Sequence, residues 1–330
     1  MTALAHERPW WIDRVRASAY RLATPWLGGL WANRDRRVAW MGLVSVTFSF
    51  ALTVIAPMWL LALGPVLLGV PHLVADARYL VAQPKLHERG PLAWVAVLPL
   101  LATGFGAPPV VSLLVLACAV ALARASVTKR IFGAVAWLGL SALSLGWPTE
   151  FLFAFLHLHN VVAIAWWWAL HGRRTRLSWA VPALVAVGTL AILSGALDPL
   201  INWSTPATAT SLPDFIASNA PFVATPMGTR LVLSFAFLQS VHYAMWLRLV
   251  PEDARARPAP RPFRETWRAL VADFGAPMLA AFTLIALAIT AWGAVDLAQA
   301  RLGYLNLAAF HGYLELGAGL LFVLEARKRW

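Results

Sequence analysis

Four apolar segments of the sequence carry histidine, and in two of them a carboxylate follows four residues later. His72 precedes Asp76 in one segment, and His311 precedes Glu315 in another. Residues four apart lie on the same face of an α-helix, so each pair can present an imidazole and a carboxylate together. Helical bundles bind iron, zinc or manganese through such side chains, projected inward from facing helices. The spacing therefore predicts a metal site inside a helical bundle.

The other two segments add candidates for the same site. One carries His157, His159 and Asn160, and the other carries His242 and Tyr243. His157 and Asn160 can share a helix face, whereas His159 lies two residues from His157 and must point elsewhere. Both of these histidines are therefore not expected to bind one ion without distortion. The candidate metal ligands are His72, Asp76, His157, His159, His242, His311 and Glu315, and the candidate catalytic residues are Asn160, Tyr243 and Tyr313.

The composition places the elements that carry these residues in a membrane. The chain has 330 residues, of which 60% are hydrophobic and 13% are charged, whereas soluble domains carry roughly 25% charged residues. So little charge cannot cover so much apolar surface in water, which excludes a soluble globular enzyme, a disordered protein and a secreted disulfide scaffold. The single Cys118 excludes a cysteine-based metal centre. We attribute the net charge of +12 to arginine-rich loops beside anionic lipid, and expect no nucleic-acid partner.

Apolar runs predict an all-α, polytopic integral membrane bundle of about ten transmembrane helices. Their expected bounds are 39–62, 65–82, 91–105, 108–123, 131–146, 151–170, 177–195, 230–250, 271–294 and 303–324. With a cytoplasmic N-terminus, every one of the 27 Lys and Arg residues except Arg230 and Arg301 lies on the cytoplasmic side, as the positive-inside rule requires. We therefore expect both termini in the cytoplasm and a multi-pass protein of a bacterial-type inner (cytoplasmic) membrane.

Several segments differ in composition from the spans of the expected bundle, residues 39–324. Residues 1–38 combine arginine with tryptophan, as an amphipathic segment at the cytoplasmic membrane surface does. Residues 325–330 form a basic cytoplasmic tail. The outside loop 196–229 is too long for a simple turn and is expected to be either a lid or a structured cap. The inside loop 251–268 is rich in proline and arginine and is expected to be a solvated linker.

The predicted topology gives the histidine-bearing spans a common depth. All four are even-numbered spans, so all run from outside to inside. Counted from the outer ends, His72 and His157 lie about six residues in, His159 and His311 about eight, and His242 about twelve, which corresponds to depths of roughly 9–18 Å. A single intramembrane histidine is more often a packing residue than a ligand. Four helices that present histidine at similar depth favour one shared site.

One segment also resembles a known family. Gly69-Val70-Pro71-His72-Leu73-Val74-Ala75-Asp76 resembles the G-x-P-H-G-x-x-D motif of the Brp/Blh family, bacterial membrane β-carotene 15,15'-dioxygenases. Leu73 stands where the motif has its second Gly, and the resemblance covers these eight residues. It implies His72 as an iron ligand with Asp76 as its neighbour, in a polytopic protein that places several intramembrane histidines on one iron and cleaves a carotenoid with dioxygen.

Together these patterns predict a membrane-embedded, metal-dependent oxidoreductase or oxygenase. The expected cofactor is non-haem iron, as one or two ions, with zinc or manganese as alternatives. The expected partners are a lipophilic substrate that enters from membrane lipid, and dioxygen. Two other functions stay open at this point: a haem protein with two of the histidines as axial ligands, and a proton-coupled transporter that uses the same histidines with Asp76 and Glu315. Asp76 could also simply pair with Arg78.

Overall fold

The computed structural model describes residues 10–93, 100, 103–171, 175–205, 210–255 and 262–325, and all regular structure within these ranges is helical. Six stretches of the described chain are long and apolar enough to cross a membrane: Arg34–Ile55, Pro57–Ala82, Pro148–Ala165, Arg176–Leu193, Ala276–Val295 and Leu297–Leu324. The all-helical class is thereby confirmed, and the six apolar stretches indicate a membrane protein. Most of the expected span 91–105 lies outside the described residues, as do residues 1–9 and 326–330. The other expected spans are shorter or less apolar helices, so the number ten stays a prediction.

The helices follow in chain order as α1 (Trp11–Ala32), α2 (Arg34–Ile55), α3 (Pro57–Asp76), α4 (Gly90–Leu92), α6 (Pro109–Ala121), α7 (Val127–Gly146), α8 (Pro148–His171), α9 (Ala180–Leu193), α10 (Leu212–Asn219), α11 (Met227–Ala244), α12 (Val250–Asp253), α13 (Phe263–Phe274), α14 (Ala276–Val295), α15 (Leu297–Leu307) and α16 (His311–Leu324). The short π-helical turns are η1 (Ala77–Ala82) and η6 (Met245–Leu249), and the 3₁₀ turns are η2 (Leu86–Glu88), η4 (Arg176–Trp179), η5 (Asp198–Leu200) and η7 (Ala308–Phe310).

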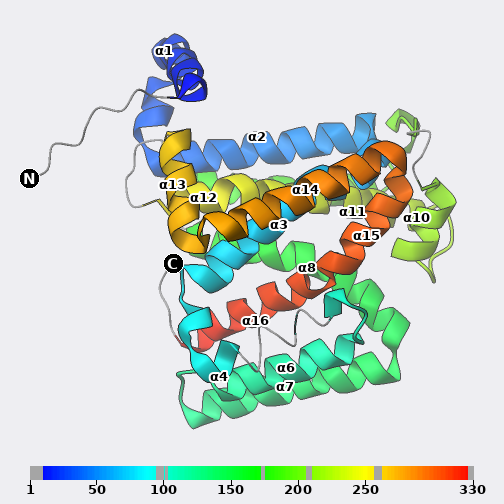
Figure 1. Ribbon diagram of the computed structural model, residues 1–330. Helices are drawn as coiled ribbons and strands as arrows, with labels where there is room; N and C mark the ends of the chain where they lie inside the picture. The colour runs from blue at the N-terminus through cyan, green and yellow to red at the C-terminus, as the bar shows by residue number, and fades with distance from the viewer. Residues whose placement is uncertain are drawn as a thin grey trace, which may run out of the picture.

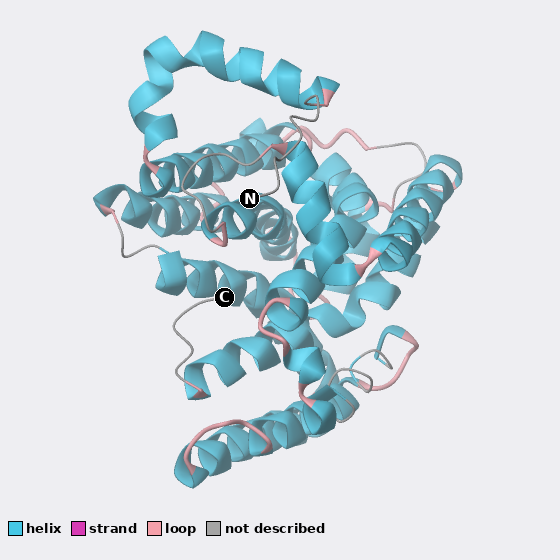
Figure 2. Cartoon of the chain, turned by 60° about the vertical axis from the view of Figure 1, so that its left-hand side comes forward, coloured by secondary structure: helices cyan, strands magenta, loops and turns pink. Residues whose placement is uncertain are grey.

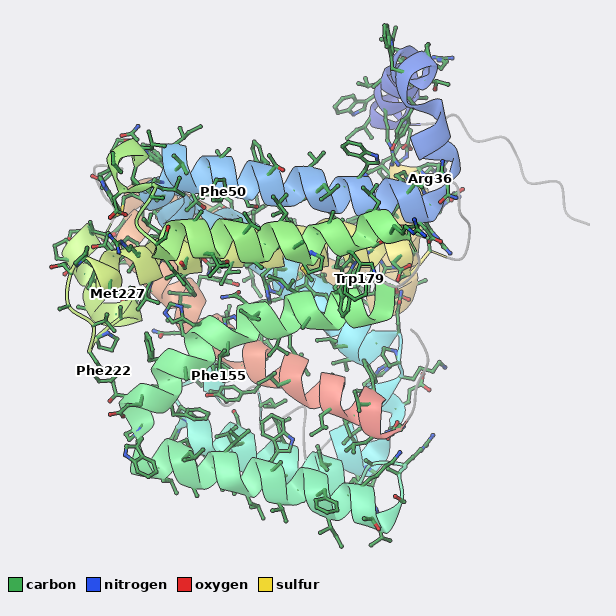
Figure 3. The ribbon with its side chains drawn as sticks, turned by 180° about the vertical axis from the view of Figure 1, so that it is seen from behind. Arg36, Phe50, Phe155, Trp179, Phe222 and Met227 are labelled. Atoms are coloured by element: carbon green, nitrogen blue, oxygen red, sulfur yellow. The ribbon has the colours of Figure 1, made fainter. Side chains whose placement is uncertain are left out.

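The four histidine-bearing helices are neighbours at the centre of the bundle. Figure 1 shows α2, α3 and α14 in the upper half, the α6–α7 pair below, and α8 and α16 between them. The view from behind in Figure 3 shows the same order. Helix α3 contacts α11, α11 contacts α8, α8 contacts α16, and α16 contacts α3. These four helices therefore close a ring, which we call the four-helix ring, and a site inside it is within reach of all of them.

The first two membrane helices divide at Ala56, and not between residues 62 and 65. Ala56 leaves the helical conformation (φ −152°, ψ 56°), and Pro57 begins α3, as suits a residue that lacks a backbone N–H and has a fixed φ. Pro65 and Pro71 lie inside α3. The expected bounds 39–62 and 65–82 are therefore wrong, because they place the break beside a proline that the helix contains.

All four histidine-bearing stretches begin earlier than their expected bounds. His72 and His242 each lie fifteen residues beyond the first residue of α3 and α11, and His159 lies eleven beyond the start of α8. His311 lies fourteen residues beyond Leu297, where the apolar stretch that includes α16 begins. At 1.5 Å per residue the four lie roughly 16–22 Å along their helices. These distances are similar to one another and longer than the sequence predicts, and a common depth in the membrane stays a prediction.

Two segments expected to be loops contain helices. The segment 196–229, expected to be an outside loop, includes α10, which packs on α11 and buries Phe215 completely. In its described part this loop is therefore the structured cap and not an open lid. The segment 251–268, expected to be an inside loop, overlaps α12 and α13. Glu252 is buried there in an ion pair with Arg37 (Nη2 to Oε1, 2.6 Å), so the expectation of a solvated linker is wrong for this end of the segment.

Helix α1 lies outside the bundle, as Figure 2 shows. Its apolar side chains Trp11, Leu22 and Trp26 are exposed. It contacts α2 and the start of α13, where the Asp13 carboxylate accepts a hydrogen bond from the backbone N–H of Phe263 at 2.6 Å. A helix with exposed tryptophan and leucine that lies beside the bundle is what an interfacial segment requires, and its place on the membrane surface stays a prediction.

Gly69 permits the close packing of α3 on α15. A Cβ at position 69 would overlap the ring of Tyr304, which is buried on α15. We expect Gly69→Ala to destabilise the protein by about 1–3 kcal/mol through overpacking, although the same change in a helix interior normally stabilises by about 0.5–1 kcal/mol. Gly64→Ala is the matched control on α3, since its Cβ would lie 3.6 Å from Tyr243 in ordinary contact. Thermal unfolding in detergent compares the two; an unchanged or higher Tm for Gly69→Ala would contradict the packing argument.

Candidate metal centre

Three imidazoles and one carboxylate meet inside the four-helix ring. His72 of α3, His242 of α11, and His311 and Glu315 of α16 each offer one ligand atom, and these atoms all lie within 4.8 Å of one another. We call this group the candidate metal centre. His72 Nε2 lies 2.6 Å from His242 Nε2, and Glu315 Oε1 lies 3.2 Å from His242 Nε2. The pair is within hydrogen-bond distance, so one Nε2–H donates to the lone pair of the other Nε2 unless a bound cation takes the place of that hydrogen.

Hydrogen bonds at Nδ1 leave Nε2 of two histidines available as a ligand. His311 Nδ1 donates to the Ala308 carbonyl, and His159 Nδ1 donates to the Phe155 carbonyl at 3.2 Å. Because a carbonyl oxygen only accepts, the proton must be on Nδ1 in both rings, and Nε2 keeps its lone pair. Metal-binding histidines are commonly held in this way by a partner on the nitrogen that does not bind the ion.

Asp76 lies on the Nδ1 side of His72, without a hydrogen bond of normal geometry at either group in the described chain. Its Oδ1 lies 3.2 Å from His72 Nδ1, and both side chains are fully buried. Arg78 instead bonds Asp273, with Nε donating to Oδ2 at 2.6 Å. The alternative in which Asp76 pairs with Arg78 is therefore wrong. The i,i+4 spacing in α3 places the carboxylate where it can orient the imidazole and increase its basicity.

The structure brings His159 to the candidate metal centre and keeps His157 away from it. The His159 ring lies 5.5 Å from the ring of His242 and 5.4 Å from that of His311, between centroids. His157 Nε2 donates to the backbone carbonyl of Asn219 at 2.8 Å, at the end of α10. The preference for His157 over His159 is therefore wrong, because a residue far along the chain supplies the hydrogen-bond partner of His157.

The bonding of the candidate metal centre fits a metal ion. In the described chain, His242 Nδ1 has no hydrogen-bond partner, and neither oxygen of Glu315 accepts a hydrogen bond of normal geometry, although all three atoms are buried. A buried polar atom without a partner costs about 1–3 kcal/mol, and more if it is charged, and a cation held by these groups would stabilise the buried carboxylate. Imidazole and carboxylate suit iron, zinc or manganese, and a thiolate that would favour copper(I) is not among the donors.

Irregular turns adjoin the ligands on three of the four helices. The π-helical turn η1 begins directly after Asp76, and η6 begins three residues after His242. The 3₁₀ turn η7 directly precedes His311. Such turns within helices are frequent at functional sites. Each such turn rotates the residues that follow it about the helix axis, relative to the residues before it, and so changes which side chains lie on one face.

Aromatic residues complete the surroundings: Tyr243, which the sequence predicts, and Trp246 and Tyr304, which it does not single out. The ring of Trp246 is nearly parallel to that of His72, with centroids 6.4 Å apart. Tyr243 meets His72 edge-to-face at 5.2 Å, and its hydroxyl is hydrogen-bonded to that of Tyr304. Trp246 follows His242 by four residues, and Tyr304 precedes the next histidine, His311, by seven. These spacings match one face of a regular helix, but η6 and η7 interrupt the two pairs, so the spacing by itself could not have placed these residues at the site.

The two other candidate catalytic residues are held by packing and by local hydrogen bonds. Tyr313 is buried and stacks on Phe155, with ring centroids 4.3 Å apart, within a core cluster that includes α6. Asn160 is buried, and its Nδ2 donates to the Leu156 carbonyl of its own helix at 3.4 Å. These contacts favour structural roles for both, whereas Tyr243 contacts the candidate metal centre directly.

His157→Ala and His159→Ala form a matched pair that tests this assignment. We expect His157→Ala to keep its metal content and to lose only about 0.5–1.5 kcal/mol of stability, because it removes one hydrogen bond to α10. We expect His159→Ala to weaken metal binding by about tenfold or more, as the loss of a ligand or its direct support does. Competition against a chelator of known affinity measures both. A metal affinity that falls for His157→Ala and not for His159→Ala would reverse the assignment.

Protein-family models, curated proteins and solved structures yield no match to this chain.

Proposed function

We propose that this chain is a membrane-embedded, metal-dependent oxidoreductase of the non-haem iron class, acting on a lipophilic substrate with dioxygen. The observation that carries the proposal is the convergence of four ligand atoms from His72, His242, His311 and Glu315 within 4.8 Å. Ionisable side chains in the middle of apolar helices are costly and usually functional, and a bound cation explains why these four gather. Histidine with carboxylate and open positions is the ligand set of non-haem iron oxygenases.

The resemblance of the segment Gly69–Asp76 to the Brp/Blh motif supports the same choice of metal. It favours iron over zinc or manganese and dioxygen as the co-substrate. Bound iron would supply one-electron chemistry with dioxygen. The remaining contributions come from the protein: Asp76 orients His72 from 3.2 Å away, Tyr243 and Trp246 enclose the imidazole, and the burial of His72 and His242 excludes water.

The proposal includes the finer topology. The chain would cross a bacterial-type inner membrane about ten times, with both termini in the cytoplasm. Its support is the distribution of Lys and Arg, of which only Arg230 and Arg301 would lie outside the cytoplasmic segments. Arg230 is paired with Asp198 (Nη2 to Oδ2, 2.7 Å), and Arg301 is buried with its Nε donating to the Leu61 carbonyl. Both exceptions therefore have a local partner.

Metal analysis of detergent-purified protein, with an absorption spectrum of the same sample, tests the function. One or two equivalents of iron without a Soret band would support it, and dioxygen uptake with lipophilic compounds would then identify the reaction. A Soret band would replace it with a haem protein. No metal after reconstitution with iron, zinc and manganese would refute it, and the polar cluster would then be tested as a proton relay by flux into proteoliposomes.

A further inference from the structure

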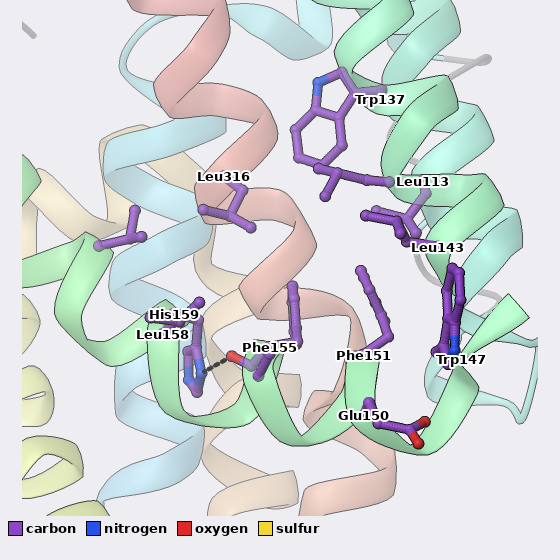
Figure 4. A pocket seen from close by; sticks show the side chains of 13 residues that line it. Leu113, Trp137, Leu143, Trp147, Glu150, Phe151, Phe155, Leu158, His159 and Leu316 are labelled. Carbon is purple, nitrogen blue, oxygen red and sulfur yellow. Dashed lines mark hydrogen bonds between the residues drawn. The ribbon is translucent and has the colours of Figure 1, made fainter. Parts of the chain in front are cut away.

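A cavity of about 470 Å³ lies between α7, α8 and α16, beside the candidate metal centre. Figure 4 shows its wall, in which Phe151, Phe155 and His159 of α8 face Trp137 and Leu143 of α7. Helices α7 and α8 meet at Trp147 and diverge from there, as Figure 3 shows from behind. The proposed function assigns no role to this cavity.

His159 connects the cavity with the candidate metal centre. It lines the cavity, and its ring lies 5.5 Å from that of His242 and 5.4 Å from that of His311. A second cavity, of about 150 Å³, is lined by Glu315 and shares Val162 and Leu316 with the first. A molecule in the larger cavity would thus be one imidazole away from the ligand atoms.

Apart from Glu150, which is also exposed, the mouth of the cavity is apolar. Leu143, Trp147 and Leu158 line it and are 47%, 59% and 57% exposed, whereas Trp137 and Leu113 at its inner wall are buried. Exposed leucine and tryptophan along two apolar helices face lipid in a membrane protein. The ligand would therefore enter sideways from the bilayer and not from water.

The charge of the lining restricts the ligand. Eleven of its thirteen residues are apolar, and the two others are His159 and Glu150; the lining includes no arginine or lysine. A phosphate or carboxylate head group would have no cationic partner there and would meet the Glu150 carboxylate, so like charges oppose its binding. The volume falls within the roughly 300–1,000 Å³ of pockets that hold one compact ligand, which is small for a two-chain phospholipid.

We propose that this cavity binds an uncharged, bilayer-dissolved lipophile and presents it to His159 at the edge of the candidate metal centre. The identification of this molecule as the substrate rests on the proposed function. Its binding in the cavity is independent of that function. The aromatic rings of Trp137, Trp147, Phe151 and Phe155 in the lining supply large apolar contact surfaces.

Photolabelling in liposomes tests the charge and the place of binding. The probes are a long-chain alcohol that carries a diazirine and the alkyl sulfonate of the same length, which is a permanent anion. We expect the alcohol to label peptides of α7 and α8 that line the cavity, and the sulfonate to label them at least about tenfold less. Equal labelling of these peptides by both probes, or labelling spread evenly over the lipid-exposed helices, would overturn the proposal.

Two tryptophan substitutions on α8 provide the matched control. Ala154 lines the cavity, whereas Ala165 is exposed on the same helix and is not part of the lining. Ala154→Trp should reduce labelling by the alcohol about tenfold by filling the cavity, while Ala165→Trp should leave it unchanged. Metal content is measured on the same samples. Cavity labelling without bound metal would refute the proposed function alone, and bound metal with labelling unaffected by Ala154→Trp would refute the cavity alone.

Discussion

His72→Ala and His311→Ala should each strip the purified protein of its metal ion. Both imidazoles belong to the candidate metal centre, and each variant leaves three of the four donors that lie within 4.8 Å of one another. Loss of an outer partner alone weakens metal binding by roughly 10–100-fold, so loss of a ligand should weaken it by more than about 100-fold. Elemental analysis after purification in detergent should find well under one tenth of the wild-type metal content.

His157→Ala is the control for both variants, because it also removes an imidazole from a membrane helix but lies away from the candidate metal centre. Helicity by circular dichroism and the elution volume in detergent show whether each variant folds. The candidate metal centre would be refuted if His72→Ala and His311→Ala both fold and both retain the full metal content. Loss of metal in all three variants would indicate general destabilisation. Iron is then added to each refolded variant: a variant that only lost stability binds iron again, whereas a variant that lost a ligand does not.

The sequence predicts the membrane class and the helical pairs of ligands well, because both depend on local patterns. Composition fixes the class, and the i,i+4 spacing of His72 with Asp76 and of His311 with Glu315 follows from helix geometry. The break between the first two spans is less predictable. Proline within an apolar run is tolerated when neighbouring helices satisfy the freed carbonyls, so Pro65 inside α3 and Pro57 at its start look alike in one sequence.

The membership of the site depends on contacts between distant segments, which a single sequence does not contain. His157 and His159 differ only in direction, and the choice between them is made by Asn219 at the end of α10, which accepts the hydrogen bond of His157. The adjacency of α3, α8, α11 and α16 is likewise a property of the packing. Histidines can share a site only if they lie at a common depth and on neighbouring helices. The second condition is met by the four-helix ring, which the sequence does not show.

Four positions of the segment Gly69–Asp76 have a clear structural role. Gly69 leaves room for the Tyr304 ring, His72 directs Nε2 into the candidate metal centre, and Asp76 lies behind His72. Leu73 is partly buried and packs against the core formed by α3, α14 and α15, so the side chain at this position faces away from the ligands. The substitution of leucine for glycine therefore need not disturb the site.

Asp76→Asn should weaken metal binding by about 10–100-fold without unfolding the protein. Asparagine keeps the shape of the buried side chain but removes the negative charge 3.2 Å from His72 Nδ1, and a carboxylate in this position raises the basicity of the imidazole that binds the ion. Asp76→Ala removes both the charge and the acceptor, so it should weaken binding further than Asp76→Asn. Chelator competition gives the three affinities on one scale.

Asp273→Asn is the matched control. Asp273 of α13 forms an ion pair with Arg78, which follows the end of α3, and it has no part in orienting His72. It should retain the wild-type metal affinity. If Asp76→Asn binds metal as tightly as wild type while His72→Ala does not, Asp76 has no orienting role and its burial has another cause. If Asp76→Asn and Asp76→Ala lose metal equally, the charge matters and the acceptor does not, since asparagine still offers an oxygen to Nδ1. A graded loss, with asparagine between wild type and alanine, is the result that assigns Asp76 to holding the imidazole in place.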